Sequence, residues 1–197
     1  MANCLVLIDS LYGIGDLHWH QSTKRKRGTG VKLPKDYVII DIETTGLNST
    51  KDEIVELSAI RVKDGKPERK PFDKLVKPKA GYIPPNIETL TGIHTAEVVN
   101  AKGIEEVLPQ FLEFIQERPV VGWNVNFDWR FIEHNHDSSL PNDIIDLIPM
   151  VKEKMPNREN YKLGTIAKEL GIDTSNAHRS IFDCIITYKV IQRILVS

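Results

Sequence analysis

The chain of 197 residues is 41% hydrophobic and 27% charged, and its formal net charge is −1, values typical of an ordinary globular domain. This composition excludes a disordered chain, a collagen-like chain and, with two cysteines in all, a disulfide scaffold. No apolar run approaches the roughly 18 residues that a membrane span needs, and the run Leu5–Ile8 lacks the basic segment of a signal peptide. We therefore expect a reducing, cytoplasmic setting without membrane attachment.

Residues 1–36 differ in pattern from the rest of the chain and predict an N-terminal extension, basic in character. Between Gln21 and Lys35 the sequence has basic residues and no acid, with Lys24–Arg27 as an unbroken basic run. A solvated tail, a targeting-like cluster and a phosphate-binding arm each explain this run. The extension leaves 37–197 as a single predicted domain.

From Tyr37 onward, apolar segments and turn residues alternate regularly. Three strand-like segments come first, the first of them β-branched, and the turns after Gly46 and at Asp64-Gly65 predict that they form an antiparallel meander. Helices then alternate with a short strand, and Pro84-Pro85 predicts a loop. The predicted strands cover 38–43, 53–62, 72–76 and 120–122, and the predicted helices cover 95–100, 104–117, 127–134, 165–170 and 181–195. This order predicts an α/β domain with a mixed five-stranded sheet flanked by helices.

Two acidic side chains stand out in the first predicted strand, because Asp41 and Glu43 follow an apolar segment. Acidic residues are depleted in strands, and the spacing of two residues places both carboxylates on one face of the sheet. Carboxylates so close together repel each other unless a cation lies between them, and a hard divalent metal prefers carboxylate oxygen. The alternative is a strand end in solvent, followed by a plain turn at Thr44-Thr45-Gly46.

Three further candidates each have an ordinary structural explanation. Asp128 falls in the first turn of the predicted helix 127–134, where the helix dipole favours an anion. Asp183 follows Ser180 at the spacing of a capping box, and His178 lies in the loop before the same helix. Taken singly, each residue is explained without a catalytic role.

Taken together, the acids and the histidine form three motifs in a defined order. The motifs are Asp41-Ile-Glu43-Thr-Thr-Gly46-Leu47, Gly122-Trp-Asn-Val-Asn-Phe-Asp128 and His178-Arg-Ser-Ile-Phe-Asp183. From Tyr37 to the C-terminus the sequence resembles the DEDDh branch of the DnaQ-like 3′→5′ exonuclease superfamily, which has a ribonuclease-H-like fold. In one departure, many members have histidine where this chain has Trp123, which concerns packing or substrate fit rather than metal binding.

The resemblance implies a role for each residue of these motifs. Two Mg²⁺ or Mn²⁺ ions would be bound by Asp41, Glu43, Asp128 and Asp183, with His178 as the general base. The terminal nucleotide would be contacted by Thr44, Thr45, Gly46, Leu90 and Asn126. Such ions neutralise developing charge and lower the pKa of a bound water, and a histidine that titrates near neutrality can accept the water's proton.

The expected function is therefore metal-dependent hydrolysis of the 3′-terminal phosphodiester of DNA, at a single strand or frayed end, in replication proofreading or repair. The resemblance also implies the products, which are nucleoside 5′-monophosphates. An exoribonuclease that trims RNA or degrades oligonucleotides is an alternative. A non-catalytic nucleic-acid-binding subunit of a polymerase complex is another, although it predicts the loss of a ligand or base and all five positions are filled here.

The expected partners are a nucleic acid with a free 3′ end, DNA before RNA, and a DNA polymerase. The sequence ends at Ser197, directly after the last predicted helix, so we expect no long C-terminal tether to such a polymerase.

Overall fold

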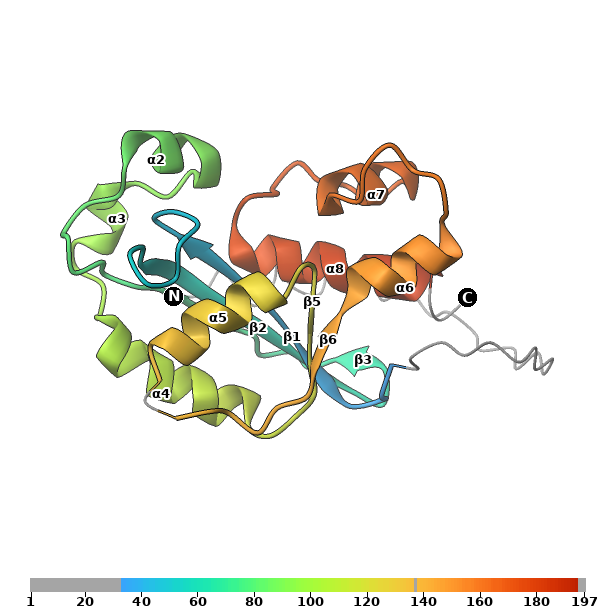
Figure 1. The fold of residues 1–197 in the computed structure, drawn as a ribbon, viewed down its shortest axis with the longest axis horizontal. Helices are drawn as coiled ribbons and strands as arrows, with labels where there is room; N and C mark the ends of the chain where they lie inside the picture. Colours follow the sequence, from blue (N-terminus) through green and yellow to red (C-terminus); the bar gives the residue numbers. More distant parts are fainter. Residues whose placement is uncertain (1–32, 137, 195–197) are drawn as a thin grey trace. The chain divides into compact units, whose positions relative to one another are not determined.

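The computed structural model describes residues 33–136 and 138–194 (Figure 1). The basic run Lys24–Arg27, most of the predicted extension and the last residue of the predicted terminal helix, Leu195, lie outside these residues. At the start of the described segment, the Lys35 carbonyl accepts a hydrogen bond from the Gly65 amide at 2.9 Å. The Asp36 carboxylate accepts one from the Asp64 amide at 2.7 Å. Residues 35 and 36 are thus tied to the turn at Asp64-Gly65.

Six strands among the described residues form one mixed sheet (Figure 1). Its order is β3-β2-β1-β5-β6, and β4 pairs with β2. The strands are β1 (Tyr37–Thr44), β2 (Ile54–Lys63), β3 (Lys66–Pro67), β4 (Phe72–Leu75), β5 (Val120–Gly122) and β6 (Ile144–Asp146). Strands β1 to β4 pair antiparallel, which confirms the predicted meander, whereas β1, β5 and β6 pair parallel. The mixed sheet is confirmed, with one strand more than the five predicted.

The central strand β1 separates two different environments because its side chains alternate between the two faces of the sheet. Val38, Ile40 and Ile42 face the main hydrophobic core. Asp41 and Glu43 therefore point to the opposite face, as their spacing predicts. The register of β1 against β2 aligns Glu43 with Glu56 and Asp41 with Ser58, so these four polar residues share that face.

Seven helices among the described residues flank the sheet (Figure 1). They are α2 (Pro85–Thr91), α3 (Thr95–Val98), α4 (Ile104–Ile115), α5 (Asn126–His134), α6 (Leu147–Lys154), α7 (Leu163–Glu169) and α8 (Ser180–Ile194). Helices α4 and α5 cover the apolar face, where Phe111 and Phe131 are fully buried. Helix α8 packs along β1 and β2 on the other face. A second apolar cluster, which includes Val151, Ile166 and Val190, joins α6 and α7 to α8.

Two of these helices differ from the predictions. The predicted loop at Pro84-Pro85 is wrong for the second proline, because α2 begins at Pro85, where the fixed φ suits the first residue of a helix. The segment Ile144–Lys154 forms β6 and α6, for which the sequence analysis predicts no element. Asp146 ends the strand and caps the helix, since its carboxylate accepts a hydrogen bond from the Ile148 amide at 2.9 Å.

Across the described ranges 33–136 and 138–194, no helix has the length and apolar character needed to cross a membrane.

Candidate active site

Three of the predicted carboxylates meet at the face of the sheet that α8 covers. Asp41 and Glu43 project from β1, and Asp183 lies in the first turn of α8. One ligand oxygen from each residue lies within 4.8 Å of those from the other two. Since Asp183 is distant in sequence from β1, the packing of α8 on the sheet creates this cluster.

Buried side chains at the start of α8 contact β1 and β2. Cys184 is fully buried, and its thiol lies 3.9 Å from the Ile39 carbonyl and 3.8 Å from the Ser58 carbonyl. The neighbouring Asp183 is thereby placed over β1. The predicted capping by Ser180 is wrong, because α8 already includes Ser180, whose buried hydroxyl is directed toward β2.

Asp128 approaches the same strand from the side of α5. Its carboxylate accepts a hydrogen bond from the Ile42 amide at 3.0 Å, and the residue is only 5% exposed. This amide lies between Asp41 and Glu43 in the chain. The Asp128 charge acts on the cluster, because it contributes to the raised pKa of Asp41. Asp128 therefore borders the three clustered carboxylates, with one of its oxygens committed to the strand.

Burial and like-charged neighbours raise the pKa values of all four acids, the neighbour being Asp146 for Asp128 and Glu56 for Asp183. Burial is the largest cause in each case. The pKa of Glu43 rises to about 8, with Asp183 as the strongest like-charged neighbour. The pKa of Asp128 rises to about 8 and that of Asp183 to about 6, although hydrogen bonds from backbone amides oppose both shifts. The pKa of Asp41 lies well above its ordinary value.

These donors fit a hard divalent cation. The clustered oxygens are carboxylate oxygens, the ligands that Mg²⁺ and Mn²⁺ prefer. Burial and like-charged neighbours raise their pKa values, and the carboxylates on β1 and α8 repel one another when they are ionised. A bound cation would remove this repulsion.

His178 precedes α8 in a left-handed conformation, with φ at 75°. Its side chain is exposed, and its backbone amide donates to the Asp183 carboxylate at 3.4 Å. The imidazole thus belongs to a turn that contacts one of the clustered acids.

Sequence reasoning missed Glu56, which is fully buried on β2 directly opposite Glu43. Its carboxylate pairs with Arg179, whose Nη2 lies 2.7 Å away. The available signal was the same as for Asp41 and Glu43, namely an acid inside an otherwise apolar strand.

The residues predicted to contact substrate after β1 form a hydrogen-bonded turn. The Thr44 hydroxyl donates to the Gly46 carbonyl at 2.6 Å, and the Thr45 hydroxyl accepts from the Glu53 amide at 2.9 Å. At Gly46 an added Cβ would lie 2.5 Å from the Asp52 carboxylate, so the glycine permits a close approach of that side chain.

The other predicted substrate residues come from separate elements. Leu90, near the end of α2, exposes 58% of its surface. Leu47, which is not among the predicted substrate residues but directly follows Gly46, exposes 87%. Asn126 is exposed as the first residue of α5. Trp123 packs in the cluster beneath α6 and α7, and its indole N–H donates to the Tyr161 carbonyl at 2.8 Å. The position that departs from the family pattern thus has a packing role.

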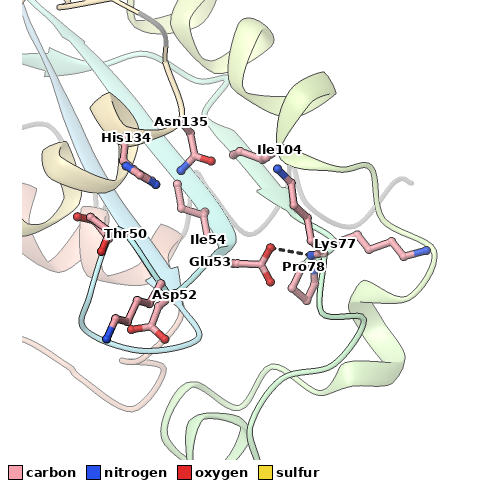
Figure 2. A pocket seen from close by; sticks show the side chains of 12 residues that line it. Thr50, Asp52, Glu53, Ile54, Lys77, Pro78, Ile104, His134 and Asn135 are labelled. Atoms are coloured by element: carbon pink, nitrogen blue, oxygen red, sulfur yellow. Dashed lines mark hydrogen bonds between the residues drawn. The ribbon is translucent and has the colours of Figure 1, made fainter.

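A pocket of about 240 Å³ lies elsewhere, on the side of the sheet that α4 and α5 cover (Figure 2). Ile54, Ile104 and His134 are among its lining residues, which include none of the four acids or His178. The Glu53 carboxylate within it accepts a hydrogen bond from the Lys79 amide at 2.8 Å. This pocket is therefore separate from the carboxylate cluster.

Comparisons of sequence identify relatives that carry the same domain. Residues 38–191 match the RNase_T family, described as exonuclease. DNA polymerase III subunit epsilon of Aquifex aeolicus is 37% identical over 168 residues, covering 83% of this chain and 82% of that protein. DNA polymerase III PolC-type of Clostridium perfringens is 38% identical over 161 residues, which cover 80% of this chain. Those residues are 11% of the PolC-type protein, so this chain spans about a tenth of its length.

Solved structures confirm the ribonuclease-H-like fold. Exonuclease X in complex with 5′ overhanging duplex DNA has a TM-score of 0.67 and 28% identity, covering 82% of this chain and 92% of that chain. Exonuclease I has a TM-score of 0.68 at 20% identity, covering 82% of this chain and 41% of that chain, and shares the fold. With residues 38–191 matched and a carboxylate cluster on the central strand, the chain belongs to the DnaQ-like RNase_T exonuclease family.

Proposed function

We propose that this protein is a 3′→5′ exonuclease that hydrolyses the 3′-terminal phosphodiester of DNA and releases nucleoside 5′-monophosphates. The observation that carries the proposal is the convergence of Asp41, Glu43 and Asp183 to within 4.8 Å, beside the turn that bears His178. Membership of the family supports exonucleolytic hydrolysis as the reaction. The 3′→5′ direction is implied by the resemblance of the three motifs to the DEDDh branch.

Two divalent ions, Mg²⁺ or Mn²⁺, would be bound by Asp41, Glu43, Asp128 and Asp183. When bound, they supply charge neutralisation at the phosphate and acidify a water. Asp128 has one oxygen engaged by the Ile42 amide, which leaves the other for this purpose. Asp183 in the first turn of α8 also benefits from the positive end of the helix dipole.

His178 acts as the general base in this proposal. Its imidazole accepts a proton from the attacking water, whose oxygen bonds to phosphorus as the bond to the penultimate 3′ oxygen breaks. That oxygen leaves with the electron pair of the broken bond and takes a proton from solvent water, which gives the 3′-hydroxyl of the shortened strand. The exposure of His178 suits this role, since the imidazole can return the proton to solvent after each cycle.

Thr44, Thr45, Gly46, Leu90 and Asn126 are proposed to contact the terminal nucleotide. The exposed Leu47 and Leu90 side chains offer apolar surface against which an unpaired base can pack. DNA is favoured over RNA because the Aquifex aeolicus relative, which this chain matches over 82% of its length, is a DNA polymerase III subunit. The exonuclease X structure contains overhanging duplex DNA. The same relatives support a DNA polymerase as partner and a role in replication proofreading or repair.

The test uses matched single-stranded DNA and RNA labelled at the 5′ end, incubated with Mg²⁺, Mn²⁺ or EDTA. Wild type is compared with His178→Ala and with His134→Ala, a control that removes an exposed histidine beside the separate pocket. We expect a metal-dependent ladder that shortens from the 3′ end of DNA, lost in His178→Ala and kept in His134→Ala.

Other outcomes would reject parts of the proposal. Preferential shortening of RNA would replace it with an exoribonuclease. Binding of either strand without cleavage would indicate a non-catalytic subunit. Full activity in His178→Ala would exclude this residue as the base.

A further inference from the structure

Glu56 makes an unusually complete set of hydrogen bonds for a buried acid. One carboxylate oxygen accepts from Arg179 Nε at 3.0 Å and from Arg179 Nη2 at 2.7 Å. The other accepts from the Ser180 amide at 2.8 Å and from the Ser180 hydroxyl at 2.9 Å. A single side chain of β2 therefore holds two consecutive residues at the beginning of α8.

This anchor has a second contact on the same strand. The Ser180 hydroxyl lies 2.6 Å from the Ser58 hydroxyl, and all three of Glu56, Ser58 and Ser180 are 0% exposed. Hydrogen bonds at buried sites are not weakened by competing water, and leaving one partner unsatisfied is costly. The junction between Arg179 and Ser180 is thus a fixed point on the sheet.

The anchored residues directly follow His178, whose φ of 75° is rarely adopted by a residue with a side chain. Such a conformation persists where the surrounding structure over-determines it. Downstream of the anchor, Asp183 belongs to the first turn of the same helix. The two residues that Glu56 contacts, Arg179 and Ser180, therefore lie in the chain between His178 and Asp183. The position of the His178 imidazole relative to the Asp183 carboxylate thus depends on them.

The location of Glu56 also argues against a merely stabilising role. It lies opposite Glu43, and its charge contributes to the raised pKa values of Asp41, Glu43 and Asp183. A neutral or apolar residue would avoid this repulsion. Arg179 offsets part of it, because the guanidinium lowers the pKa of Glu43.

We propose that Glu56 is a positioning residue that acts through Arg179 and Ser180 to fix the turn of His178 beside the carboxylate cluster. This role rests on the proposed exonuclease function, in which His178 accepts the proton. Glu56 itself touches neither the substrate nor the reacting atoms.

The decisive variant is Arg179→Lys, which keeps the positive charge near Glu43 but cannot form two hydrogen bonds with a planar fork. With a short single-stranded DNA and Mn²⁺, we expect kcat to fall about tenfold while KM changes less than about twofold, as for a misplaced group that acts only in the transition state. The affinity of the protein for Mn²⁺, measured by calorimetry without DNA, should stay within about twofold.

A double-mutant cycle separates positioning of His178 from general damage. In a His178→Ala background, Arg179→Lys should lower the residual kcat no further, because the group that it positions is already absent. An equal loss in both backgrounds would overturn the proposal, as would a wild-type kcat in Arg179→Lys.

Arg61→Lys is the matched control. Arg61 is a half-buried arginine on the same strand as Glu56, opposite Val38, and its Nε donates to the Phe114 carbonyl at 2.8 Å. The kcat of the Arg61→Lys variant should equal that of wild type.

A measurement independent of activity tests the anchor itself. Amide hydrogen exchange of the peptide that spans residues 176–182 should become about tenfold faster in Arg179→Lys and in Glu56→Gln, and not in Arg61→Lys. Unchanged exchange would overturn the anchoring role. If wild type cleaves neither DNA nor RNA but exchange behaves as expected, the exonuclease proposal fails while the anchor stands.

Discussion

Glu43 on β1 and Glu56 on β2 lie directly opposite each other, on the sheet face that α8 covers. Like charges in this arrangement are destabilising. The two carboxylates differ in the side chains that surround them. Glu56 is paired with Arg179 and bonded to Ser180. Glu43 joins Asp41 and Asp183 in a cluster, and its pKa is raised to about 8. The fold thus pairs one carboxylate with a basic side chain and places its neighbour in the cluster that is proposed to bind a cation.

The stability of the metal-free protein should fall as pH rises. Unfolded Asp and Glu titrate near pH 4, whereas Asp183 titrates at about 6 and Glu43 and Asp128 at about 8 in the folded protein. Between these values the folded state holds more protons than the unfolded state, so the free energy of unfolding decreases with pH. In EDTA we expect Tm to drop progressively from about pH 5 to about pH 8.

Adding Mg²⁺ at the upper end of this range should restore Tm, because the cation replaces the bound protons. Glu43→Gln provides the control, since loss of one titrating group should make the pH dependence in EDTA shallower. A Tm that rises through this range in EDTA would contradict the raised pKa values.

Asp41→Asn should separate activity from stability. The substitution removes one proposed metal ligand and should lower kcat by about 100-fold or more. It also removes like-charge repulsion, so the metal-free variant should be at least as resistant to urea as wild type at pH 8. Asp143→Asn, at an exposed position beside β6, should change neither property. An Asp41 variant with full metal-dependent activity would remove Asp41 from the site.

Asp128 has both a structural and a proposed catalytic role, which two substitutions can separate. Asp128→Asn keeps an oxygen that can accept the Ile42 amide hydrogen bond, and an asparagine resembles the protonated acid that the pKa of about 8 favours at neutral pH. Asp128→Ala leaves this buried amide unsatisfied, at a cost of about 1–3 kcal/mol. We expect both variants to be inactive and only the alanine variant to unfold at clearly lower urea. Equal stability of the two would show that the hydrogen bond contributes little.

Gly122 controls how closely α5 approaches the sheet. An added Cβ would lie 2.9 Å from the Val125 side chain and 3.1 Å from the Ile40 carbonyl. Gly122→Ala should therefore destabilise the protein by about 1–3 kcal/mol in urea denaturation and lower activity, because Val125 directly precedes the helix that carries Asp128. Gly164→Ala, in α7, meets no atom within 4 Å and should instead stabilise by about 0.5–1 kcal/mol. This account would be contradicted if both substitutions raised, or both lowered, the free energy of unfolding.

Residues 1–32 should contribute to DNA binding and not to folding. A chain that begins at Leu33 keeps the hydrogen bonds of Lys35 and Asp36 and removes the basic run Lys24–Arg27. We expect an unchanged Tm, weaker binding of single-stranded DNA at low salt and a shallower dependence of binding on salt, measured by fluorescence anisotropy. Identical salt dependence in both proteins would support the solvated-tail interpretation of the extension.

Two of the elements that the sequence failed to predict, β6 and α6, meet at Asp146. Strand β6 has three residues and is half-buried, too short for an alternating pattern to emerge. Helix α6 contains Pro149 in its first turn, where the amide that proline lacks would have no partner within the helix. In the sequence, however, a proline at this position interrupts the pattern by which a helix is predicted. Both depend on Asp146, whose carboxylate accepts from the Ile148 and Asn124 amides.

The sequence by itself determined the meander, the existence of the last helix and the shared face of Asp41 and Glu43, because these follow from local periodicity. Only the tertiary structure decided which of the acids on β1 and β2 forms an ion pair with Arg179. Arg179 is 123 residues from Glu56 in the chain, and the packing of α8 across β1 and β2 brings it to Glu56 rather than to Glu43. Electrostatic pairing acts over distances in space, so a pattern along the chain does not contain it.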